Sequence, residues 1–299
     1  MGAEIAGSEC LESRPGLRVA LIGAGSVGTS VALLLARHGH GISGVASRSE
    51  VSARAAAVRL DARLFDYSRE LPDSDLVLIA TSDNAIEEVA RVVAERVSAG
   101  ITVCHFAGSL GLDPLRAVLA VGARACALHP VQALPDVDTA VARLPGSAWG
   151  VTSSEEARAW AFSLVSDELE GHPVWVAEEH RPLWHAAAVT TSAGLRALLS
   201  SAVAMLESIG VEEGSSVLGP LVSGTLANSL EGQGVTLTGP FVRGETDTVA
   251  GHLASFDAYA PELKGDYVRV ATLILEGVAR SRRLPEDAYG SIRALLESA

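Results

Sequence analysis

Leu17-Arg18-Val19-Ala20-Leu21-Ile22, followed without a break by Gly23-Ala24-Gly25-Ser26-Val27-Gly28, is the stretch that decides the fold. The apolar run predicts a buried strand, and the apolar spacing along 29–38 predicts a helix that ends at Gly39. A glycine motif between a strand and a helix is typical of dinucleotide-binding domains. The first glycine permits the tight turn, the second lets backbone approach a pyrophosphate, and the third lets the helix pack closely. We therefore predict cofactor contacts from Gly23, Gly25, Ser26, Val27 and Gly28. The alternative is a tight turn that binds nothing.

Further short apolar runs alternate with helical patterns through the first half of the chain. Strands are expected at 42–46, 75–80, 101–105, 123–128, 148–152 and 173–176. This alternation predicts an α/β fold, a Rossmann doubly wound parallel sheet over residues 17–177. After Ala177 only helical patterns follow, at 182–209, 217–230, 246–256, 261–281 and 285–298, so residues 178–299 are expected to form an all-α C-terminal domain. Residues 1–16 are polar, lack a signal-peptide core and are expected to be a disordered tail.

Composition excludes several classes of partner. The 299 residues carry a formal net charge of -13, which argues against nucleic acid and against an anionic membrane surface. No run of 18 uncharged apolar residues occurs, so no membrane span is expected. Cys104 and Cys126 lie in apolar runs, and no CxxC motif is present, which indicates buried thiols in a reducing, cytoplasmic compartment. We predict a small-molecule partner and no metal site.

The end of the second predicted strand indicates which nucleotide is bound. NAD sites usually place an acid there, whereas NADP sites place a basic residue near the 2′-phosphate. This chain reads Val45-Ala46-Ser47-Arg48-Ser49, with no carboxylate. We predict that Arg48, with the hydroxyls of Ser47 and Ser49, holds the phosphate of NADP. The alternative is a solvated arginine in a loop.

Polar residues also follow the strand at 75–80. Thr81, Ser82 and Asn84 are expected at the carboxyl edge of the sheet, where they would line the cofactor's ribose. The same residues could instead cap the next helix, and both roles could hold together.

Two histidines end the next two strands. His105 is a candidate to orient the nicotinamide, and His129, in His129-Pro130-Val131-Gln132, is a candidate substrate-binding residue. The alternative for each is a polar side chain that satisfies loop backbone.

The first turns of the long helix carry the candidate proton donor. Helical spacing places His185, Val189, Ser192 and Arg196 on one stripe, among small residues that allow close approach. We predict His185 and Ser192 as catalytic, because histidine transfers protons near neutral pH. The alternative is a helix-packing face.

A loop between later helices is the candidate anion site. Thr238, Arg243 and Thr246, with Thr248, bring hydroxyls and a guanidinium near a predicted helix start, which suits a substrate carboxylate. The alternative is an ordinary loop with Thr246 or Asp247 as helix cap.

The chain resembles the domain-of-unknown-function family DUF2520. That family is related to pyrroline-5-carboxylate reductase and, more distantly, to ketopantoate reductase and other 6-phosphogluconate-dehydrogenase-like enzymes. The resemblance covers nearly all of the chain after the tail. It rests on the glycine motif, Ala80 to Ile86, His105 with Gly108, 129–132, Trp184-His185-Ala186-Ala187-Ala188-Val189 and Leu237-Thr238-Gly239-Pro240 with Arg243-Gly244.

The resemblance implies an NADPH-dependent reductase with a helical second domain that forms a homodimer. It implies hydride transfer to the C=N or C=O carbon of a small carboxylate in the interdomain cleft. One departure matters, because ketopantoate reductases use a lysine and an asparagine where this chain has His185 and Val189. A 2-oxo-acid reductase and a non-catalytic NADP-responsive regulator remain the alternatives.

Overall fold

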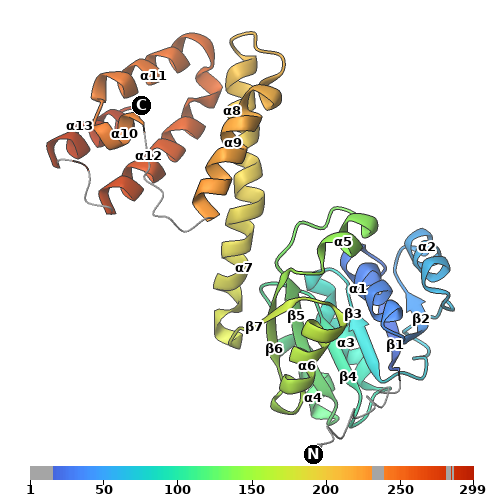
Figure 1. Cartoon of the computed structure of the whole chain (residues 1–299). Coiled ribbons are helices and arrows are strands. Elements are labelled where there is room, and N and C mark those ends of the chain that lie inside the picture. Colours follow the sequence, from blue (N-terminus) through green and yellow to red (C-terminus); the bar gives the residue numbers. More distant parts are fainter. Residues whose placement is uncertain (1–15, 231–238, 281–283, 285) are drawn as a thin grey trace, which may run out of the picture. The chain divides into compact units, whose positions relative to one another are not determined.

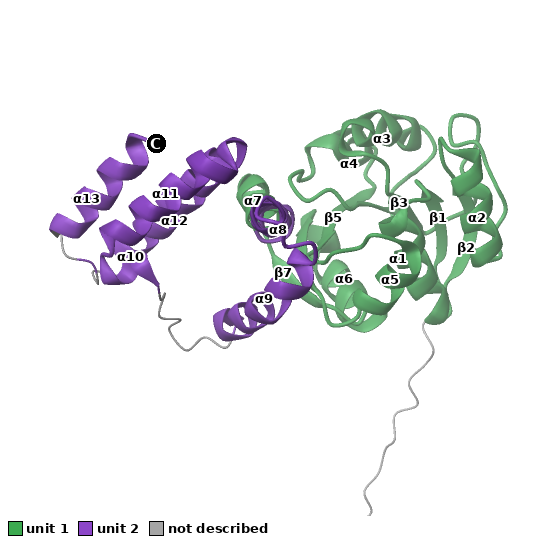
Figure 2. Cartoon of the chain, turned by 90° about the horizontal axis from the view of Figure 1, so that it is seen from above, with its two compact units in different colours: residues 1–190 green, residues 191–299 purple. Residues whose placement is uncertain are grey.

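The computed structural model describes residues 16–230, 239–280, 284 and 286–299. It divides into two compact units, the first reaching Thr190 and the second beginning at Thr191 (Figure 2). The division predicted after Ala177 lies upstream of this one. The predicted tail, apart from Gly16, lies outside the described residues.

Unit 1 is built on one seven-stranded sheet (Figure 1). Its order is β2-β1-β3-β4-β5-β6-β7, and the predicted Rossmann fold is confirmed. The strands are β1 (Arg18–Ile22), β2 (Gly41–Ala46), β3 (Leu76–Ile79), β4 (Thr102–His105), β5 (Arg124–Pro130), β6 (Ala148–Ser153) and β7 (His172–Trp175).

The expectation of a wholly parallel sheet is wrong at one edge. β6 pairs antiparallel with β5, and β7 pairs parallel with β6, so both run against the other five strands. A parallel neighbour needs a long crossover that carries the chain back to the end of the sheet where the previous strand began, whereas an antiparallel neighbour does not. The connection after β5 holds only the short helix α5 (Val137–Arg143), which suits an antiparallel strand. Alternating polarity in the sequence does not encode strand direction.

Strand order fixes where a ligand of this sheet belongs. β2 lies on one side of β1 and β3 lies on the other, so the chain reverses its direction of winding at β1. Ligands of open α/β sheets bind at such a reversal, outside the carboxyl ends of the strands. The glycine motif after β1 and the Thr81–Asn84 segment after β3 stand on either side of this point.

Helices cover both faces of the sheet (Figure 1). One apolar layer joins α1 (Ser26–Arg37), α2 (Glu50–Leu60), α5 and α6 (Arg158–Ser163) to alternate strand residues such as Leu21 and Leu78. The other layer joins α3 (Ile86–Ala94) and α4 (Arg116–Ala120) to the intervening residues, such as Ile22 and Ile79. Cys104 and Cys126 are free and buried on the paired strands β4 and β5, as predicted.

A long helical segment follows β7. It comprises η5 (Glu178–His180), α7 (Arg181–Val189), a π-helical turn η6 (Thr190–Gly194) and α8 (Leu195–Glu207). Within the described ranges, 178–207 is the one helix long and apolar enough, by length and composition, to cross a membrane. The absence of a membrane span stays a prediction.

Unit 2 contains helices alone among its described residues, in agreement with the sequence. α8 packs on α9 (Gly214–Leu230), and the remaining helices are α10 (Pro240–Arg243), α11 (Thr246–Tyr259), α12 (Lys264–Arg280) and α13 (Glu286–Glu297). Their core is formed by Phe241, Val249, Leu275 and Ile292, with neighbours from the same helices.

Candidate cofactor and active site

The glycine turn after β1 is held tightly against β3. Gly23 has φ +106°, and a Cβ at this position would lie 2.3 Å from the carbonyl oxygen of Ala80. A Cβ on Gly28 would lie 2.5 Å from the Ala80 Cβ. Both glycines are therefore required by the close approach of turn, helix and strand, as the sequence predicts.

The same turn leaves space at its tip. A Cβ on Gly25 would meet no atom within 4 Å, and no side chain caps α1. The Ser26 Oγ is buried without a hydrogen-bond partner among the described residues. The first amides of a helix lack intrahelical partners and attract anions. Open space, unpaired amides and an unpaired hydroxyl fit a bound pyrophosphate, and Val27 supplies one of these amides.

The end of β2 presents a positive charge. Arg48 is exposed and forms no ion pair with any residue in the described ranges. Ser47 is half-buried, and Ser49 caps α2, where its Oγ accepts from the Ser52 amide at 3.3 Å. The cap leaves the Ser49 hydroxyl proton available. This arrangement fits a 2′-phosphate.

The segment after β3 does not form the side-chain cap that the sequence allowed. Ser82 precedes η1 (Asp83–Ala85), and its Oγ donates to Asn84 Oδ1 at 2.8 Å rather than accepting from a helix amide. Thr81 is half-buried, and Ser82 and Asn84 are exposed. Their contact with a ribose stays a prediction.

His105 is placed as a loop anchor. Its ring is fully buried, Nε2 lies 2.7 Å from the Gly111 carbonyl, and the Ala107 amide donates to Nδ1 at 3.2 Å. Burial lowers its pKa to about 4. Because backbone groups occupy both ring nitrogens, the expected contact with the cofactor is corrected: the ring organises the loop after β4.

A second group of aromatic side chains gathers beside that loop. The Trp184 Nε1 donates to His129 Nδ1 at 3.1 Å, and the His129 and His185 rings meet edge to face with centroids 5.5 Å apart. His129 lies at the end of β5 and His185 on α7. The structure thus brings together two of the sequence-predicted site residues.

Two glycines make room for this group. A Cβ on Gly108 would lie 2.4 Å from His185 Cδ2 and 2.9 Å from His129 Nε2. A Cβ on Gly150, the β6 partner of His129, would lie 2.7 Å from Trp184 Nε1. Side chains at either position would displace the rings.

Arg181 fixes the start of α7 and was missed by the sequence reading. It is fully buried, and its guanidinium donates to three carbonyls, Leu110 at 3.1 Å, Gly150 at 3.0 Å and Ala107. Burial lowers its pKa to about 10, so it stays charged at neutral pH. The Pro182 that follows offered a helix start but no signal for a buried cation.

Ser192 lies in a turn that is not α-helical. It is exposed within η6, and α-helical spacing ends at Val189. A π-helical turn carries an extra residue. The catalytic role of Ser192 stays a prediction.

The predicted anion site in unit 2 is also altered. The Arg243 Nε donates to Glu245, and its terminal nitrogen bonds the same carboxylate at 3.2 Å. Thr246 Oγ1 donates to the Gly244 carbonyl at 3.5 Å, and Glu245 rather than Thr246 or Asp247 precedes α11. Thr238 lies outside the described residues. The sequence analysis did not consider Glu245, whose carboxylate pairs with the Arg243 guanidinium that was expected to bind the substrate.

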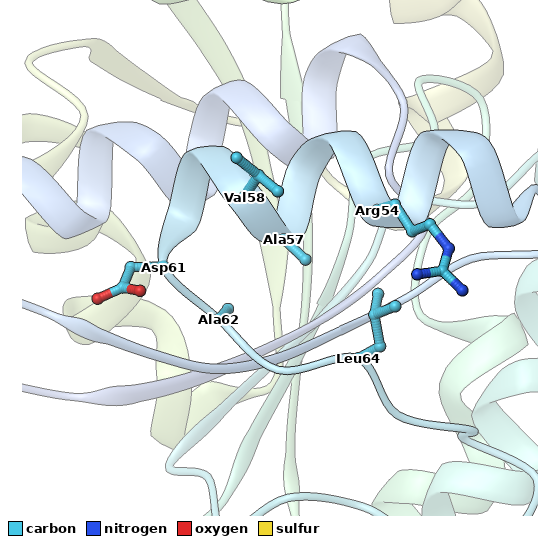
Figure 3. A pocket seen from close by; sticks show the side chains of 6 residues that line it. All are labelled: Arg54, Ala57, Val58, Asp61, Ala62 and Leu64. Carbon is cyan, nitrogen blue, oxygen red and sulfur yellow. The ribbon is translucent and has the colours of Figure 1, made fainter.

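One pocket of unit 1 lies apart from these residues. A pocket of about 570 Å³ lies along α2 and the loop after it, lined by Arg54, Ala57, Val58, Asp61, Ala62 and Leu64 (Figure 3). None of the predicted site residues lines it. Within the described ranges, no group of three or more His, Cys, Asp or Glu side chains is placed to hold a metal.

Two known domain families match parts of the chain. Residues 6–130 match a Rossmann-like domain, and residues 147–274 match the domain of unknown function DUF2520. The resemblance predicted from the sequence is thereby confirmed. No match is found among functionally curated proteins.

Solved structures share the fold of this chain at low identity. A candidate NADP oxidoreductase from Bacteroides fragilis is 23% identical with TM-score 0.71, covering 88% of this chain and 99% of its own. A reductive aminase from Aspergillus terreus, in complex with NADPH and ethyl-5-oxohexanoate, is 19% identical with TM-score 0.64, covering 93% and 99%. A pyrroline-5-carboxylate reductase from Coxiella burnetii is 16% identical with TM-score 0.56, covering 94% and 97%.

Proposed function

We propose that the chain is an NADPH-dependent reductase that transfers hydride to the C=O or C=N carbon of a small carboxylate. Two observations carry this proposal. The glycine turn leaves open space at Gly25, at the point where the strand order of the sheet changes direction, and Arg48 at the end of β2 makes no ion pair with a described residue. The NADPH complex of the Aspergillus reductive aminase supports the choice of cofactor.

The chain's own residues divide the work along the carboxyl edge of the sheet. The amides that begin α1 and the Ser26 hydroxyl hold pyrophosphate, and Arg48 holds the 2′-phosphate. NADPH, when bound, supplies the hydride. At the end of β5 and on α7, the His129 and His185 rings face the substrate, and His185 delivers the proton to the reduced oxygen or nitrogen.

Charge at this end of the sheet favours an anion. Arg181 is buried and makes no ion pair within 4.0 Å with a described carboxylate, although the charge of Glu178 offsets part of its own. The Arg181 charge still lowers the pKa of both His105 and His129. A positive potential in a partly buried site attracts a carboxylate. This support for a carboxylated substrate replaces the Arg243 site, whose charge Glu245 neutralises.

Calorimetric titration with NADPH and NADH tests the cofactor. Arg48→Ala should weaken NADPH binding at least tenfold and leave NADH binding unchanged, because a charge-assisted phosphate contact is worth about 1.5–3 kcal/mol. Arg54→Ala is the matched control, since Arg54 already pairs with Glu50 at 2.6 Å. Preference of the wild type for NADH would refute the assignment.

Turnover is tested by following NADPH oxidation against panels of 2-oxo acids and cyclic imines. His185→Ala should reduce kcat at least a hundredfold, within the usual contribution of a general acid. Tight NADPH binding without turnover on any panel would favour the non-catalytic regulator.

We also propose that the chain forms a homodimer through α8 and α9 of unit 2. These helices expose large apolar side chains, with Leu198 43%, Leu221 68% and Leu230 85% exposed. Apolar patches of this kind mark protein–protein interfaces. Sedimentation equilibrium should give a dimer that Leu221→Glu weakens; a monomeric wild type would refute it. A cytoplasmic location stays a prediction.

A further inference from the structure

The hydrogen bond between Trp184 and His129 determines which nitrogen of His129 carries a proton. An indole N–H only donates, so His129 Nδ1 must accept with its lone pair. A neutral imidazole with a free Nδ1 lone pair carries its proton on Nε2. Trp184 therefore selects the Nε2–H tautomer, and it opposes protonation of Nδ1.

Other neighbours of His129 also keep the ring neutral. Burial lowers its pKa to about 4, and the charges of Arg181 and His185 act in the same direction. At neutral pH the ring is therefore a fixed hydrogen-bond donor, not a group that takes up and releases protons. The nearby His185, which is half-buried, is then the histidine that donates the proton to the reduced atom in the proposed reaction.

The Nε2 atom of His129 lies close to the backbone of Gly108, where the lack of a side chain leaves room for the ring. Nε2 lies 2.9 Å and His185 Cδ2 lies 2.4 Å from the place that a Gly108 Cβ would occupy, so the two rings themselves fill this place. His129 Nε2 makes no hydrogen bond to a described residue, and it is absent from the fully buried unpaired atoms. The N–H is thus available to a ligand.

We infer that His129 binds an oxygen atom of the substrate through its neutral Nε2–H, and that Trp184 is the positioning residue that sets this tautomer. The inference rests on the proposed reductase function and narrows its substrate class. A donor suits a carbonyl or carboxylate oxygen. It opposes a protonated imine, whose own N–H would face the N–H of His129. The substrate presented at this point is an oxygen acceptor, which is either the carbonyl of an oxo acid or the carboxylate of the substrate.

The tautomer is tested without any turnover by two-bond ¹H–¹⁵N NMR of the full chain, which separates protonated from unprotonated ring nitrogens. His129→Gln identifies the signals by their loss. The wild type should show the proton on Nε2. Trp184→Phe should reduce the ratio of the two tautomers about fivefold, the equivalent of one hydrogen bond of about 1 kcal/mol.

Trp175→Phe is the matched control, because the Trp175 ring stacks against the Arg158 guanidinium at 3.9 Å and makes no hydrogen bond to His129. Thermal unfolding confirms that each variant is folded. A wild-type proton on Nδ1, or a tautomer ratio that Trp184→Phe leaves unchanged, would overturn the role of Trp184.

The ligand is tested by adding three probes at saturating NADP⁺. These are pyruvate, which has a carbonyl and a carboxylate, propionate, which has only the carboxylate, and N-methyl-1-pyrrolinium, an iminium cation that offers no acceptor atom at any pH. Pyruvate should shift the His129 Nε2–H signal, and an equal shift with propionate would assign the carboxylate as the acceptor. A shift with N-methyl-1-pyrrolinium alone, or with none of the three, would overturn the contact. NADPH affinity and turnover are measured separately, so a failed reductase proposal is distinguished from a failed role for His129.

Discussion

Replacing Gly108 by alanine should disturb both histidines of the site at once. The new Cβ would lie 2.4 Å from His185 Cδ2, 2.9 Å from His185 Cγ and 2.9 Å from His129 Nε2. Cγ is the ring atom nearest the backbone, so the His185 ring cannot relieve the clash by moving its tip. α7 cannot withdraw easily either, because Arg181 ties its first turn to three carbonyls.

The expected size follows from these distances. Ordinary carbon contacts begin near 3.4 Å, so the His185 ring must move by about 1 Å, and displacements of that size in an active site cost about a hundredfold in rate. Overpacking of a filled site also costs about 1–3 kcal/mol in the free energy of unfolding. NADPH affinity should be unchanged within about twofold, since the glycine turn lies at β1.

Three measurements on one variant check this reasoning: kcat on whichever substrate supports NADPH oxidation, chemical unfolding, and the His129 ring signals in NMR. Gly41→Ala is the control, because a Cβ there meets nothing within 4 Å and Gly41 begins a strand of the same sheet. If Gly108→Ala leaves the ring signals and the free energy of unfolding unchanged, the two histidine rings do not pack against Gly108 as described. An equal loss of kcat in Gly41→Ala would refute the reasoning as well.

Other predictions concern the glycine turn of unit 1 and one charged pair in each unit. Gly28→Ala should lower the free energy of unfolding by about 1–3 kcal/mol in urea, because its Cβ would lie 2.5 Å from that of Ala80; wild-type stability would contradict the close helix packing. Glu245→Gln should leave cofactor affinity unchanged and free the Arg243 guanidinium; a calorimetric change in NADPH binding would contradict that separation. The hydrogen bonds from Arg18 lower the pKa of Asp75 from 3.8 to about 2. The stabilisation of the folded state by this pair is therefore complete above pH 3.8 and is lost as the pH falls toward 2. Asp75→Asn should therefore cost under about 1 kcal/mol at pH 7 and nothing below pH 2 in acid-unfolding curves; an equal cost at both would exclude an ionic origin.

The sequence predicts the fold well where the signal is local. Each of the seven strands was expected from an apolar run, and the long helix from its spacing between Pro182 and Gly210. The direction of β6 was not predicted, because pairing direction depends on the connection rather than on polarity. The extra residue in η6 was missed for a similar reason: Thr190 to Gly194 reads as regular helix, and only three-dimensional contacts decide otherwise.

The site was predicted in part. His129 and His185 were named from strand and helix ends, and the structure places them together. Arg181 was missed because its partners are carbonyls of residues 31 to 74 positions away, and no side-chain pattern marks them. Arg243 was misjudged because a neighbouring acid, Glu245, was read as ordinary loop. Charge compensation two residues away is visible in a sequence, but its geometry is not.

The three carbonyl bonds of Arg181 bear on how this protein can be taken apart. They attach the first turn of α7 to the sheet, so Trp184 and His185 belong to the Rossmann unit although they lie in a long helix. A fragment cut after Ala177 would lose half of the histidine site, whereas one ending after Thr190 would keep it whole. A chimera that joins residues up to Thr190 to the helical unit of a distant relative would therefore keep both His129 and His185.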